Sequence, residues 1–152
     1  MAARAEAGAR TVYRYFPSQV DLFQAVWERL GGQVALPLLA SEIVESAEQT
    51  FERFDTHERM VMVLLPLLGG DDPRARVAFD NCLAHLTTGM EDAERGRVVA
   101  VFVALCSAPF WQLLRDRGGQ SGPEARAALI WTLETLLAAL QKAALPRRRA
   151  EP

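Results

Sequence analysis

The side chains best suited to chemistry lie near the start of the sequence, where Arg10, Thr11, Tyr13, Arg14 and Tyr15 follow one another closely. A short helix is predicted after Gly8, with Val12 and Phe16 on its apolar side. Arginine and the hydroxyls of tyrosine and threonine donate hydrogen bonds to phosphates, and arginine also reads the edge of guanine. The segment therefore has the chemistry of a helix that contacts nucleic acid.

No other group of residues suggests a reactive site. His57 and His85 are the only histidines, and their spacing to other ligand types does not fit zinc. We find no nucleophile beside an orienting base, no glycine-rich phosphate loop and no paired carboxylates. We therefore expect a protein that is not an enzyme, with no metal and no cofactor.

Composition and charge exclude several further classes of protein. The 152 residues suit one compact domain, and the net charge of −2 does not indicate a generally basic nucleic-acid binder. No apolar run is long enough for a membrane helix, and Met1 to Arg10 does not resemble a signal peptide. Cys82 and Cys106 stand in apolar surroundings. They predict buried, reduced thiols in a cytoplasmic protein.

The apolar periodicity is helical throughout, and we expect an all-α fold without strands. Ser18 with Asp21, and Ser121 with Glu124, have the spacing of capping boxes. Asp55 with Glu58 suggests a similar cap. The helices are predicted over 18–30, 34–54 (broken early by Pro37), 57–68, 73–90, 93–117 (kinked by Pro109) and 121–144.

The last two predicted helices are the most apolar. Either the rest of the domain wraps around them, or they pair with a second copy of the chain. The candidate interface residues are Val98, Leu105, Trp111, Leu129, Leu133 and Leu136.

One segment is similar to a known family. The run from Arg10 to Ser18, followed by Asp21-Leu22-Phe23, resembles the recognition helix and the start of the fourth helix of TetR-type transcriptional regulators. A second, weaker resemblance covers Leu113 to Asp116, Gly118, Ser121 and Glu124-Ala125, before and into the family's final helix.

The resemblance implies the end of a helix-turn-helix followed by a ligand-binding and dimerisation bundle. Residues 1–17 would be an incomplete helix-turn-helix remnant with the recognition helix, 18–145 the helical ligand-binding and dimerisation domain, and 146–152 a disordered basic tail. Arg10 and Arg14 would reach base edges, while Thr11, Tyr13 and Tyr15 would contact phosphates. The implied partners are a second copy, operator DNA once the N-terminus is completed, and an unknown small apolar or amphipathic inducer, with no membrane.

Apolar residues of the middle helices are candidates for the inducer pocket, because pockets are mostly apolar and adaptable. An ordinary core is the alternative for each of them. The candidates are Phe51, Phe54, Met60, Leu64, Phe79, Leu83, Leu86 and Phe102.

The chain also departs from the family pattern. It begins after the family's first helix, Glu6 stands where the turn usually has glycine, and Gln19 replaces a frequent lysine. Either Met1 is not the native start, or the short form lacks autonomous DNA binding. The sequence thus predicts a ligand-controlled TetR-like regulator that acts as a repressor. The alternative is a dimeric ligand-binding or interaction module without DNA binding.

Overall fold

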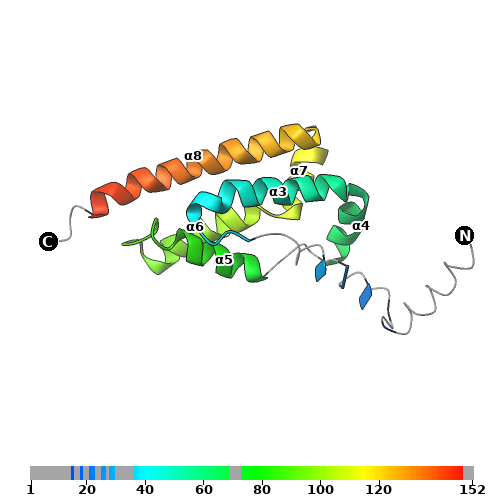
Figure 1. The fold of residues 1–152 in the computed structure, drawn as a ribbon, viewed down its shortest axis with the longest axis horizontal. Helices are drawn as coiled ribbons and strands as arrows, with labels where there is room; N and C mark the ends of the chain where they lie inside the picture. Colours follow the sequence, from blue (N-terminus) through cyan, green and yellow to red (C-terminus); the bar gives the residue numbers. More distant parts are fainter. Residues whose placement is uncertain are drawn as a thin grey trace, which may run out of the picture.

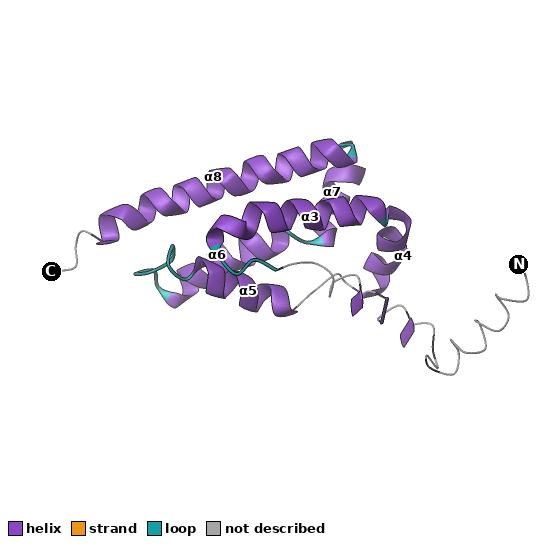
Figure 2. Ribbon diagram, in the orientation of Figure 1, coloured by secondary structure: helices purple, strands orange, loops and turns teal. Residues whose placement is uncertain are grey.

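The computed structural model describes residues 36–68 and 73–148, together with isolated positions nearer the N-terminus (Tyr15, Ser18, Asp21, Leu22, Ala25, Val26, Glu28 and Arg29). Within these residues the chain is all-helical and contains no strand, which confirms the predicted all-α class (Figure 2). The elements are η1 (Ala40–Glu42), α3 (Ile43–Thr56), α4 (Glu58–Leu68), α5 (Pro73–Leu83), α6 (Asp92–Leu105), α7 (Ala108–Asp116) and α8 (Gly122–Arg148).

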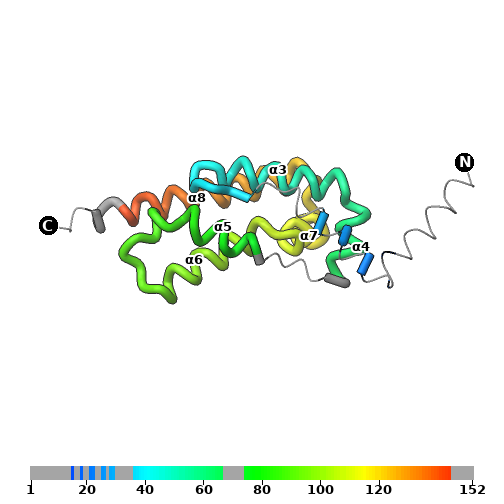
Figure 3. Tube along the Cα trace, turned by 60° about the horizontal axis from the view of Figure 1, so that its bottom comes forward, coloured from blue at the N-terminus to red at the C-terminus, as the bar shows by residue number. Residues whose placement is uncertain are grey.

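The helix α8 lies along α3 over much of its length, although the two are far apart in sequence (Figure 1). Consecutive helices α5 and α6 pack against each other as a hairpin, which a second view also shows (Figure 3). The short helix α7 contacts α3, α4, α6 and α8. It therefore sits where the two helix pairs meet.

A single apolar core fills the space between these helices. Its largest fully buried side chains are Trp111, Phe51 and Phe102, from α7, α3 and α6. Leu129 and Leu133 of α8 complete the core from the other side and are also fully buried. Each such side chain stabilises the fold by roughly 1.5–3 kcal/mol relative to leaving it in water. The apolar side of α8 is thus buried largely by other helices of the same chain.

Two of the predicted caps are present. The backbone N–H of Ser18 donates to Oδ2 of Asp21, and the N–H of Asp21 donates to Oγ of Ser18, both at 3.1 Å. At the start of α8, the N–H of Ser121 donates to Oε2 of Glu124 at 2.8 Å. Hydrogen bonding from the Ser121 side chain, and then from its backbone N–H, lowers the pKa of Glu124 because it favours the ionised form.

Several predicted boundaries were wrong. Asp55 lies inside α3 and caps nothing, because its carboxylate has a partner elsewhere in the fold. The helix expected to reach Met90 ends at Leu83, since turns occupy the residues from Ala84 onward. Finally, α8 continues past the expected end at Ala144 to Arg148 and so includes the first residues assigned to the tail.

The helix predicted over 93–117 is two helices. It breaks at Cys106 and Ser107, and α6 and α7 are bent by 57° relative to each other. Ser107 caps α7 by accepting from the N–H of Phe110 at 3.4 Å. Pro109 therefore stands in the first turn of a new helix, where its missing N–H has no cost, rather than at a kink within one helix.

Across the described ranges, none of the helices taken singly has the length and apolar composition needed to cross a membrane; α6 and α7 meet these criteria only together, as a bent pair.

Candidate ligand-binding core and helix surface

The candidate pocket residues gather in the core. Phe51, Leu64, Phe79, Leu83, Leu86 and Phe102 are all buried, from α3, α4, α5, the turn after α5, and α6. Phe54 is half-buried and packs against this core. Met60 differs, because 41% of its surface is exposed at the start of α4. The structure thus brings six of the eight candidates into one core cluster, leaves Leu64 buried but outside that cluster, and leaves Met60 at the surface.

The aromatic rings form two contacting groups. Phe54 lies between Phe51 and Trp111, with ring centroids 6.1 and 5.9 Å apart. Phe79 and Phe102 pair across α5 and α6 at 6.2 Å. The tilted arrangement at these distances is favourable for aromatic rings. Rings and leucines in such contact form a packed apolar interior.

A cluster of polar side chains lies at the edge of the core, near the N-terminal end of α8. The indole Nε1 of Trp111 donates to Oδ1 of Asp55 at 2.9 Å. Nε of Arg126 lies 3.6 Å from Oδ2 of the same carboxylate. A Cβ added at Gly122 would lie 2.6 Å from Oδ2 of Asp55, so the carboxylate occupies the place a side chain would need. The cluster joins α3, α7 and α8.

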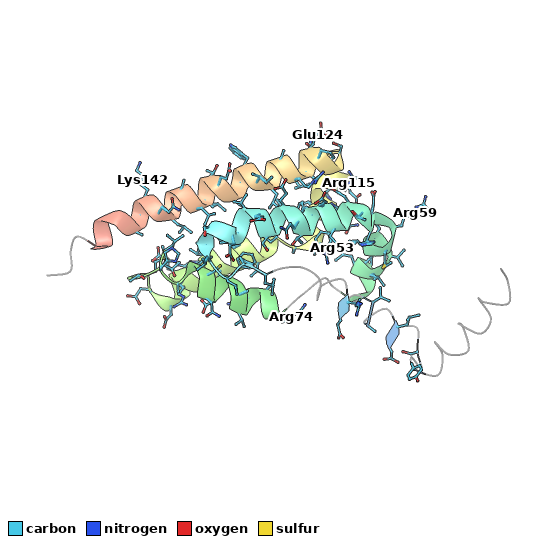
Figure 4. All side chains as sticks on the ribbon, viewed as in Figure 1. Arg53, Arg59, Arg74, Arg115, Glu124 and Lys142 are labelled. Atoms are coloured by element: carbon cyan, nitrogen blue, oxygen red, sulfur yellow. The ribbon has the colours of Figure 1, made fainter. Side chains whose placement is uncertain are left out.

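A second ion pair continues this cluster toward α4. Nη2 of Arg115 donates to Oε1 of Glu58 at 2.9 Å, and its guanidinium lies 5.8 Å from the Trp111 ring centroid. A guanidinium group over the face of an indole ring is stabilised by the cation–π interaction. Figure 4 places Arg115 close to the N-terminal end of α8, where Glu124 is labelled.

Sequence reasoning missed this cluster. Asp55 was interpreted as a cap, and Arg126 was not singled out. One signal was present: an indole within a strongly apolar segment needs an acceptor for its N–H when buried. The sequence does not show which of the 19 acidic residues supplies it.

The six candidate interface residues face inward. Trp111, Leu129 and Leu133 are fully buried in the single chain, while Val98, Leu105 and Leu136 are partly buried and pack against the core. The first three leave no surface for a second copy in this arrangement. The exposed large apolar side chains of α6, α7 and α8 are instead Val101, Leu113 and Trp131, and Trp131 is 69% exposed.

Of the candidate DNA-contacting residues, only Tyr15 is described. It is helical and exposed. Arg10, Thr11, Tyr13 and Arg14 lie outside the described residues.

The two cysteines are free thiols, and burial raises the pKa of Cys82 to about 11 and that of Cys106 to about 12. A neutral thiol is a poor nucleophile and a poor metal ligand. Among the described side chains, no three His, Cys, Asp or Glu residues gather to hold a metal ion.

Comparison with known proteins gives no match: no protein-family model, no curated protein and no solved structure is significantly similar to the chain.

Proposed function

We propose that the chain is a TetR-like transcriptional regulator, a repressor whose DNA binding is controlled by a small molecule in the helical bundle. The proposal rests on the resemblance of the segment from Arg10 to Phe23 and on the helical architecture. It places the protein in the cytoplasm, as a homodimer, with no catalytic activity.

The observation that supports the proposed homodimer is the outer face of α8. Ala127, Trp131, Thr135 and Ala138 recur at helical spacing along this helix, and all four are exposed. They form an uncharged stripe centred on a large aromatic ring, which we call the α8 stripe. Because the opposite side of α8 is already buried in the core, a second copy can pair through this stripe without disturbing the chain's own packing.

The proposed inducer binds among the aromatic side chains of the core. The core is apolar, with the Asp55 cluster as a polar group at one end. The proposed inducer is apolar or amphipathic, because the side chains around it are mostly apolar. To control transcription, it must bind the DNA-competent and DNA-incompetent states with different affinity.

The proposed DNA contact uses the segment from Arg10 to Tyr15. A dimer that reads two half-sites about one helical turn apart needs a fixed separation between its two recognition helices. Ligand binding in the bundle then acts by changing that separation.

Oligomeric state is the first test. Light scattering should give twice the mass of 16.8 kDa for the wild type. Trp131→Glu should give a monomer, because a charge replaces the ring at the centre of the stripe. Val77→Glu on α5 is the matched control, since Val77 is also largely exposed but lies outside the stripe. A dimer that survives Trp131→Glu contradicts pairing through this face.

DNA binding is the second test. Duplex fragments selected from a random library should be retained, with retention falling steeply as salt rises. Arg10→Ala and Arg14→Ala should abolish selection. Lys142→Ala, which removes the same charge from the far part of α8 (Figure 4), should not. A dimer that retains no DNA favours the alternative function, a ligand-binding or interaction module.

A further inference from the structure

Arg126 lies between two carboxylates of the neighbouring helix α3. Its Nε is 3.6 Å from Oδ2 of Asp55, and its Nη1 is 3.7 Å from Oε1 of Glu52. Both distances exceed the 2.7–2.9 Å usual for a charge-assisted hydrogen bond. The guanidinium is thus attracted to both acids and is hydrogen-bonded to neither.

The two acids differ in burial. The side chain of Glu52 is 66% exposed, that of Asp55 is 22% exposed and that of Arg126 is 25% exposed. Oδ2 of Asp55 and Nε of Arg126 are each fully buried, and neither has a hydrogen-bond partner among the described residues. Leaving two buried, oppositely charged atoms unbonded at this distance is costly, and a small movement would join them.

Asp55 is the fixed side of this pair. Its Oδ1 accepts from the Trp111 indole, and its carboxyl group fills the space beside Gly122. The carboxylate also lies at the first turn of α8, where the helix dipole favours a negative charge. Arg126, on a long flexible side chain, is therefore the group that moves.

We propose that Arg126 is a two-position latch between α8 and α3, paired with Asp55 in one position and with Glu52 in the other. In the inner position, its Nε donates to Oδ2 of Asp55. In the outer position, the guanidinium pairs with Glu52 at the surface, and Asp55 keeps only its bond to Trp111. The latch acts within one chain and stands whether or not two copies pair through α8.

Glu52→Gln tests the latch without disturbing the core, because Glu52 is exposed. This variant removes the outer partner, so Arg126 should settle on Asp55. In nuclear magnetic resonance spectra, the Nε–H proton of Arg126 should then exchange with water about tenfold more slowly, the factor expected for one charge-assisted hydrogen bond. The indole N–H signal of Trp111 should shift with it, since both groups share one carboxylate.

Salt and a second variant provide opposing tests. Raising sodium chloride to about 1 M screens the exposed Glu52 pair more than the buried one, so the wild type should shift in the same direction as Glu52→Gln. Asp55→Asn keeps an acceptor for Trp111 but removes the inner charge. It should therefore speed the exchange of the Arg126 Nε–H proton.

Glu48→Gln is the matched control, one turn before Glu52 on α3 and exposed. It should leave the Arg126 and Trp111 signals unchanged. The latch is refuted if Glu52→Gln and 1 M salt leave the Arg126 exchange rate at its wild-type value, or if Glu48→Gln changes it equally.

Discussion

We predict that replacing Trp111 by phenylalanine markedly destabilises the fold. The ring of Trp111 is fully buried, and its Nε1 donates to Asp55 at 2.9 Å. Phenylalanine keeps an aromatic ring beside Phe54 but cannot donate this hydrogen bond. The carboxylate then loses the only side-chain hydrogen bond that it accepts within the described part of the structure.

The cost has two parts. Losing a hydrogen bond to a charged, largely buried acceptor costs about 1.5–3 kcal/mol. The smaller ring buries less apolar surface, which costs roughly 1 kcal/mol more. The sum is about 3 kcal/mol, which corresponds to a fall in melting temperature of roughly 6–12 °C for a chain of this size.

Thermal and urea unfolding followed by circular dichroism measures this change. Trp131→Phe is the matched control: the same substitution on an exposed ring should change the free energy of unfolding by less than about 0.5 kcal/mol. In an Asp55→Ala background, Trp111→Phe should cost only its packing part of roughly 1 kcal/mol. Equal losses in both backgrounds would refute a contribution from the hydrogen bond.

Three further predictions concern small residues and thiols. Gly122→Ala should lower the melting temperature because its Cβ would lie 2.6 Å from the Asp55 carboxylate, whereas Gly96→Ala, with open space around it inside α6, should stabilise the fold by about 0.5–1 kcal/mol. Cys82 should not react with a thiol reagent at pH 8 until the protein unfolds, and rapid labelling of this thiol in the native chain would contradict its burial. The folded state holds both thiols neutral, so the free energy of unfolding should be greatest below pH 9.0 and fall as the pH rises toward 11; a flat urea midpoint over that range would contradict the raised pKa values.

Local features of the fold were predictable from the sequence. The pairs Ser18 with Asp21 and Ser121 with Glu124 cap their helices through contacts three residues apart, so their spacing alone identifies them. The all-helical class followed in the same way, from the spacing of apolar residues. Helix caps and apolar spacing can be identified without knowing which distant segments of the chain pack together.

Tertiary partners were not predictable. Asp55 has the spacing of a cap, but its partner Trp111 lies 56 positions away, and the buried indole overrides the local preference. Likewise, an apolar stripe such as Leu129 and Leu133 shows that a helix face is covered without showing what covers it. The core of the same chain covers these two residues, and the exposed Trp131 was not singled out.

The packing of α8 on α3 also has a consequence for the order of folding. The hairpin of α5 and α6 joins neighbouring segments, so its contacts close short loops and form rapidly. The contact between α3 and α8 closes a loop that includes every helix between them. During synthesis, the side of α3 that packs on α8 must therefore stay uncovered until α8 has left the ribosome. This interval is the period in which the nascent chain is most exposed to aggregation and most dependent on chaperones.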